Sequence, residues 1–161
     1  GIDTLEPFIT RADATNSGLF ILNRTSNPGA GDLQDRLVDD MPLYMHLASM
    51  LAPIAGARIG TSGWSSIGIV AGATWPDEAM ALRSTLPNAP FLVPGFGAQG
   101  AGPEKALSGL TRSHDHWQGG LINSTRGLIF PESARDVSSI DAWHNAIVAK
   151  INADKHVLNS I

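Results

Sequence analysis

The sequence contains no cysteine. A disulfide framework, a thiolate zinc site and a cysteine nucleophile are therefore excluded. An excess of positive charge is also missing: 11 Lys and Arg stand against 15 Asp and Glu, which argues against a nucleic-acid-binding protein. No apolar run reaches the roughly 18 residues of a membrane span. No signal peptide opens the chain, and we expect a cytoplasmic protein without a membrane or nucleic-acid partner.

What the sequence does contain is a set of short runs that are apolar nearly throughout. They lie at residues 18–23, 66–71, 89–93 and 119–123. Such runs predict strands covered on both faces, as parallel strands are. Amphipathic stretches predict helices at 33–41, 43–54, 77–86, 103–110 and 142–158, with Asp32 as the N-cap of the first. The opening residues 1–11 suggest a loop that runs into a short helix. This alternation predicts βα units around a parallel sheet.

Each predicted strand is followed by a loop rich in glycine, proline and small polar residues. These loops span residues 24–31, 72–76, 94–102 and 123–127. They fall at the carboxyl ends of the strands, where ligands bind in barrels and open sheets. The last loop places Arg126 among small neighbours, and an arginine fork with nearby backbone N–H groups can hold a phosphate.

These loops resemble those of the orotidine 5′-phosphate decarboxylases, particularly the subfamily with a Thr-Ser-Asn-Pro segment. The matching segments are Thr25–Ala30, Val70–Pro76, Phe91–Gly100 and Asn123–Gly127. The resemblance implies a (β/α)₈ barrel that forms homodimers, with active sites at the subunit interface and no metal or organic cofactor. It also implies conversion of orotidine monophosphate to UMP and CO₂.

The resemblance assigns roles to individual residues of this sequence, all of them in substrate binding. Ser26 would hydrogen-bond the imide edge of the pyrimidine, which suits a hydroxyl that both donates and accepts. Pro94 would line the pocket beside the ring, and Gln99 would reach from a mobile loop toward the phosphate and the pyrimidine. Arg126 would hold the phosphate, together with backbone N–H groups near Thr125 and Gly127.

The family's catalytic signature, Asp-x-Lys-x-x-Asp, is absent. The only lysines are Lys105, Lys150 and Lys155, and none has the required acidic neighbours. The opening segment Gly1–Phe8 resembles the stretch after the family's fourth strand, and a complete barrel needs about 250 residues. We therefore expect residues 1–161 to form a single region, the C-terminal half of a barrel with about four parallel βα units. The isolated chain would lack activity and would pair through its open sheet edges, for example with the missing N-terminal half.

Other interpretations stay open beside this one. The chain could be a non-catalytic half-barrel that binds a phosphorylated ligand or assembles with a complementary chain. It could also be another phosphosugar barrel, such as a relative of the pentulose-phosphate epimerases, although the loops lack the histidines and acids of a metal site. The segment Arg112–Trp117 contains His-x-His and an aspartate, but without a further ligand we interpret it as a solvated loop. Residues 95–100 match G-x-G-x-x-G without the acidic residue of a dinucleotide site.

Overall fold

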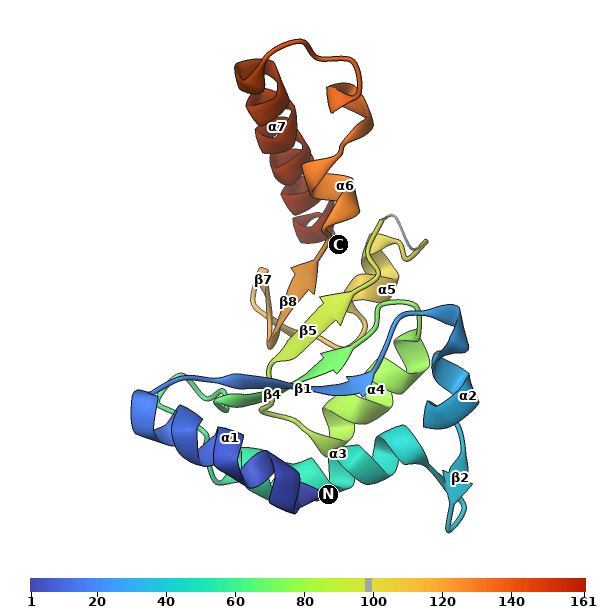
Figure 1. The fold of residues 1–161 in the computed structure, drawn as a ribbon, viewed down its shortest axis with the longest axis vertical. Coiled ribbons are helices and arrows are strands. Elements are labelled where there is room, and N and C mark those ends of the chain that lie inside the picture. The colour runs from blue at the N-terminus through green and yellow to red at the C-terminus, as the bar shows by residue number, and fades with distance from the viewer. Residues whose placement is uncertain (98–99) are drawn as a thin grey trace.

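The computed structural model describes residues 1–97 and 100–161. Its centre is a four-stranded sheet in which β1 (Leu19–Arg24), β4 (Ile67–Ala71), β5 (Phe91–Pro94) and β8 (Gly120–Asn123) lie side by side in that order. All three pairings are parallel. The spatial order follows the chain order, as in the wall of a barrel. The four predicted strands and the parallel sheet are therefore confirmed (Figure 1).

Three helices cover one face of this sheet (Figure 1). They are α1 (Ile2–Thr15), α3 (Leu43–Gly56) and α4 (Pro76–Thr85). The core lies between the helices and the sheet, where Leu51, Ile69, Leu82 and Phe91 are almost completely buried. Proline at the first position suits the start of α4, because a proline has no N–H that would need an acceptor within the helix.

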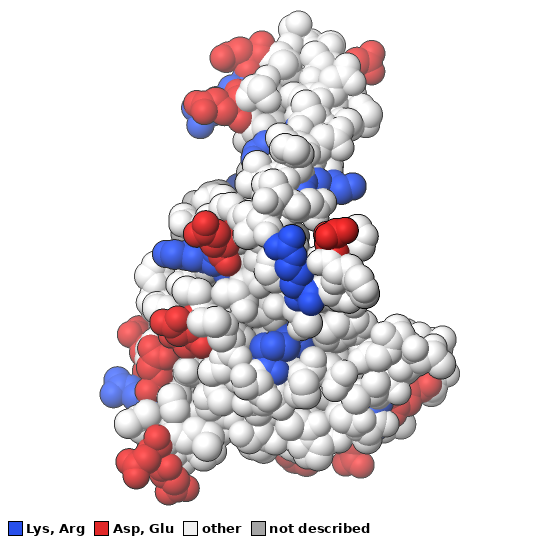
Figure 2. Space-filling model, turned by 180° about the vertical axis from the view of Figure 1, so that it is seen from behind, with Lys and Arg blue, Asp and Glu red and all other residues white. Residues whose placement is uncertain are grey.

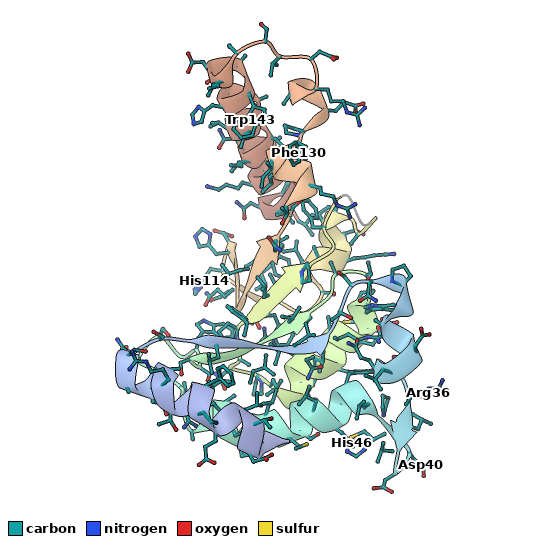
Figure 3. The ribbon with its side chains drawn as sticks, viewed as in Figure 1. Arg36, Asp40, His46, His114, Phe130 and Trp143 are labelled. Carbon is teal, nitrogen blue, oxygen red and sulfur yellow. The ribbon has the colours of Figure 1, made fainter. Side chains whose placement is uncertain are left out.

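The C-terminal part of the chain forms smaller elements and one long helix. α5 (Pro103–Leu107) follows β5, and α6 (Arg126–Ile129) and the 3₁₀ turn η2 (Glu132–Ala134) follow β8. The long helix α7 (Ile140–Asn159) is capped by the Ser139 hydroxyl, which accepts from the Ala142 N–H at 3.2 Å. Figure 1 shows α7 extending away from the sheet, and Figure 3 shows Trp143 and Phe130 in this arm.

The predicted helix over residues 33–41 is wrong. The chain instead forms the 3₁₀ turn η1 (Pro28–Ala30), the short helix α2 (Gly31–Gln34) and an antiparallel hairpin of β2 (Leu37–Val38) and β3 (Met41–Pro42). The cause is the pair Asp39 and Asp40, whose φ angles of 48° and 61° suit a two-residue hairpin turn and not a helix. Asp32 accordingly lies inside α2 and is not an N-cap.

Two further expectations about local structure are wrong. Residues 2–15 form the 14-residue helix α1, where the sequence suggests a loop and a short helix. The segment Arg112–Trp117 is not an irregular loop, because it contains most of the hairpin made by β6 (Thr111–Ser113) and β7 (His116–Gln118). His114 adopts a φ of 53° in the turn of that hairpin.

The sheet face opposite the helices is open, so the strands are not all covered on both faces as their sequences predict. One row of this face runs in register through Leu22, Val70, Leu92 and Leu121. The outer two are 61% exposed each, and Phe20 is 43% exposed beside them. We call these five residues the open face. In a closed barrel this side of the sheet faces the interior.

Candidate functional site

Hydrogen bonds join all four loops at the carboxyl end of the sheet. The Gly72 N–H donates to the Arg24 carbonyl at 2.8 Å and links the ends of β1 and β4. The Ala73 N–H donates to the Pro94 carbonyl at 2.8 Å and links β4 to β5. The Ser124 hydroxyl donates to the Phe96 carbonyl at 3.3 Å and links β5 to β8. The loops that the sequence marks as ligand-binding therefore form one connected edge.

A cavity of about 90 Å³ lies in this edge, between the loops after β5 and β8. Pro94, Thr125 and Arg126, which the sequence analysis assigns to substrate, line it together with Gly95, Phe96, Asn123 and Ser124. Such a cavity can hold a small oxyanion or one end of a larger ligand.

Arg126 and Gly127 occupy the first turn of α6, where backbone N–H groups have no acceptor within the helix. The Arg126 side chain is exposed. Gly127 lies against the Ser124 hydroxyl, since a Cβ at this position would be 2.9 Å from that oxygen. Arg126 and the hydroxyl residues Ser124 and Thr125 thus line the cavity beside the start of α6, and an arginine with neighbouring hydroxyls suits a phosphate.

Ser26 lies at the same edge but not in this cavity, because its loop follows β1 while the cavity follows β5 and β8. The Thr74 hydroxyl donates to the Ser26 carbonyl at 3.1 Å, which ties the loop to the one after β4. Gly72 makes this approach possible, since a Cβ there would be 2.8 Å from both the Ser26 nitrogen and its Cα. The structure therefore separates the predicted pyrimidine contact from the predicted phosphate contact by the width of two strands.

Gln99, the remaining predicted substrate contact, lies outside the described residues.

Sequence reasoning missed the residue that holds the Ser26 loop. Arg24 is 1% exposed and ends β1. Its guanidinium contacts Asp35 and Glu78 and lies over the Trp75 ring. The only signal in the sequence is an arginine directly after an apolar run.

A second arginine is half-buried at the amino ends of the strands. Arg83 of α4 donates to five carbonyl oxygens, including those of Gly109, Ala89 and Gly119 at 2.7–2.8 Å. Burial lowers the pKa of Arg83 to about 10, so the guanidinium remains charged at neutral pH. A hollow of about 510 Å³, beside the Asp13–Arg58 ion pair, also lies on this side and contains none of the predicted site residues.

Other kinds of site find little support in the part of the chain that the structure describes. No group of three or more His, Asp or Glu side chains there could hold a metal ion. None of the helices in residues 1–97 and 100–161 is long and apolar enough to cross a membrane. On the face seen in Figure 2, basic and acidic side chains are interspersed.

The fold and this edge define the class: a parallel α/β protein of the barrel type, with a cavity at the carboxyl ends of its strands. No family model matches the sequence. Curated relatives match it over nearly its whole length. The orotidine 5′-phosphate decarboxylase of Haloarcula marismortui is 45% identical over 99% of this chain, and that of Rhodopirellula baltica is 35% identical over 92%. The chain belongs to the orotidine 5′-phosphate decarboxylase family.

Solved structures give the same result for the fold. The OMP decarboxylase of Leishmania donovani superimposes with a TM-score of 0.63 at 31% identity and covers 97% of this chain. The UMP synthase of the same organism gives a TM-score of 0.64 at 34% identity. The chain spans about half the length of the curated relatives it matches, 49% and 54% of the two named above. This share agrees with the expected C-terminal half of a barrel.

Proposed function

We propose that this chain is the substrate-binding part of an orotidine 5′-phosphate decarboxylase, which converts orotidine monophosphate to UMP and CO₂ in the cytoplasm. The observation that carries the proposal is the cavity formed by Pro94, Thr125 and Arg126 at the carboxyl edge. In this proposal the cavity takes the 5′-phosphate. The relatives at 35% and 45% identity support the choice of this reaction over other phosphate chemistry.

The chain contributes binding groups and leaves the proton transfer to another segment. Its three lysines lack the Asp-x-Lys-x-x-Asp pattern that the resemblance implies for the chemistry. We place these acids and lysines in a complementary N-terminal half, which would close the barrel over the open face. Residues 1–161 then form one region of a single domain, and the complete enzyme forms a homodimer that needs no cofactor.

Binding energy at the phosphate serves catalysis because it is available far from the reacting carbon. Contacts to a remote group can be used to close loops and to order the reacting centre. Ser26 would read the pyrimidine at the β1 end of the edge, while Arg126 holds the phosphate at the β8 end. Gln99 would act between them.

The first test is the affinity of the complete enzyme for UMP, measured by calorimetry for wild type and for Arg126→Ala. One charge-assisted contact to phosphate contributes about 1.5–3 kcal/mol, so we expect Kd to rise by roughly tenfold to a hundredfold. Arg135→Ala is the matched control: this arginine is exposed and pairs with Glu132 in η2, outside the cavity. An unchanged Kd in Arg126→Ala would remove the phosphate assignment.

The second test concerns the chain alone. Purified 161-residue material should form no UMP from orotidine monophosphate, and activity should return when a segment with the Asp-x-Lys-x-x-Asp pattern is supplied. Turnover by the chain alone would contradict the division of roles. Binding of UMP by a stable monomer that no such segment activates would instead favour the alternative function, a non-catalytic phosphate-binding half-barrel.

A further inference from the structure

The side chain of Arg24 is turned away from the open face by an irregularity in β1. Leu22 pairs with Val70 and Arg24 pairs with Ala71, so Asn23 is an extra residue between two consecutive pairs. In a regular strand Arg24 would share the side of Phe20 and Leu22. The bulge directs it toward the helices instead, and bulges beside active sites commonly have this effect.

In this position the guanidinium contacts four side chains from three helices and their caps, α2, α3 and α4. It lies 2.9 Å from the Asp35 carboxylate after α2 and 3.4 Å from the Glu78 carboxylate of α4. Its Cζ lies 4.3 Å from the centre of the Trp75 ring and 5.2 Å from that of Tyr44 in α3. A buried arginine is stable only when such partners replace water, and a planar fork with an aromatic neighbour suits arginine and not lysine.

Trp75 and a further neighbour of the guanidinium, Gln34, hold the backbone directly before Ser26. The Trp75 indole N–H donates to the Thr25 carbonyl at 2.9 Å. The Gln34 side chain, 3.4 Å from the guanidinium, accepts from the Thr25 N–H at 3.1 Å and donates to the Thr25 hydroxyl at 3.1 Å. Thr25 is thus fixed from two sides, one residue before Ser26.

We propose that Arg24, Asp35, Trp75 and Glu78, which we call the Arg24 clamp, position Ser26 for contact with the substrate base. None of the four would touch the substrate. They act through Thr25: Trp75 donates to its carbonyl, and Gln34, which the Arg24 guanidinium contacts, accepts from its N–H. Asp35 and Glu78 hold the guanidinium in place, and the fixed Thr25 backbone sets the direction of the next side chain. This proposal rests on the proposed function, because it takes Ser26 as a substrate contact.

A positioning role can be distinguished from a general structural role by a double-mutant test. The effect of a positioning residue on kcat/KM depends on the presence of the Ser26 hydroxyl, and the effect of a structural residue does not. In the complete enzyme we expect Arg24→Met to lower kcat/KM by about tenfold or more, because small displacements of a positioning group are costly. In a Ser26→Ala background the same substitution should cost less than about threefold, since residues that act through one another are not additive. Arg24→Lys keeps the charge without the fork and should fall between wild type and Arg24→Met.

Arg83→Met is the matched control, since Arg83 is also an arginine held by several polar partners and an aromatic ring, but at the other end of the strands. It should lower thermal stability and leave kcat/KM within about twofold, with the same effect in both Ser26 backgrounds. If Arg24→Met lowers kcat/KM by the same factor with Ser26 and with Ser26→Ala, its effect does not pass through Ser26. Arg24 is then only structural, and the proposal is overturned.

Because Arg24→Met could fail to fold, a milder variant tests the same connection. Trp75→Phe keeps an aromatic ring beside Arg24 and removes only the N–H that donates to Thr25. We expect a loss of about fivefold in kcat/KM, which again shrinks in the Ser26→Ala background. Full activity in Trp75→Phe would overturn the clamp. Absence of decarboxylation and UMP binding in the wild-type enzyme would instead refute the proposed function.

Discussion

At the scale of single residues, two partly or fully buried arginines have different roles: we assign Arg24 to the ligand edge and Arg83 to stability. Arg24 lies at the carboxyl ends of the strands, with two carboxylates as partners. Arg83 lies at the amino ends, where five backbone carbonyls accept its hydrogen bonds. We therefore assign Arg24 to ordering the loop after β1. Arg83 links the backbone segments that precede β5 and β8.

The role of Arg83 leads to a prediction about stability. Arg83→Met should lower the free energy of unfolding by about 3 kcal/mol, because several buried carbonyls lose their donor at once. Urea denaturation followed by circular dichroism measures this. Arg36→Met is the control, since Arg36 is exposed and its Nε bonds only the Asp32 carbonyl. It should change stability by less than about 0.5 kcal/mol, and equal effects of the two substitutions would contradict the assignment.

At the scale of elements, the ligand edge depends on how closely the loop after β4 approaches the loop after β1. The sequence marks both loops as ligand-binding but gives no sign of this contact. Gly72 decides it, because its missing side chain lets the two backbones meet. Position 72 requires glycine because the Ser26 backbone leaves no room for a Cβ, and not because of its own backbone angles.

The Gly72 contact can be tested with one methyl group. Gly72→Ala would place Cβ 2.8 Å from the Ser26 backbone, so the loop must move. We expect UMP affinity of the complete enzyme to fall by about tenfold, the scale of a misplaced positioning group. Gly56→Ala at the end of α3 has open space and should leave binding unchanged. Equal Kd values for both variants would mean that the approach of the loops is dispensable.

At the scale of the whole molecule, the sheet has two parallel edges and an open face. β1 and β8 are the outer strands of the four, and Phe20 and Leu22 on β1 and Leu121 on β8 are exposed. An exposed apolar sheet face with free edges favours pairing with another chain. The segment that completes the barrel would remove both features at once.

The isolated chain should accordingly self-associate in sedimentation experiments. Replacing Leu22 and Leu121 with lysine should shift it toward monomer, because charge on the open face opposes burial. Leu37→Lys provides the control: Leu37 is 64% exposed, but it belongs to the β2–β3 hairpin and not to the sheet face. A wild-type chain that stays monomeric at all concentrations would contradict this interpretation.

The sequence by itself determined the four strands, the main helices and the order of the loops. Apolar runs and amphipathic periodicity are local signals, so β4 and α7 are close to where their residues predict them. Turn preferences overrode helix periodicity at Asp39 and Asp40, where the local sequence is compatible with both a helix and a hairpin turn. Family resemblance, and not periodicity, supplied the roles of Ser26 and Arg126.

Only the tertiary structure decided which loops meet and what holds them. The bulge at Asn23, the burial of Arg24 against Trp75 and the gap left by Gly72 all depend on contacts across about fifty residues of sequence. It also decided that apolar strands have an open face, because hydrophobic sequence records what a strand is suited to bury, whereas the fold determines what covers it.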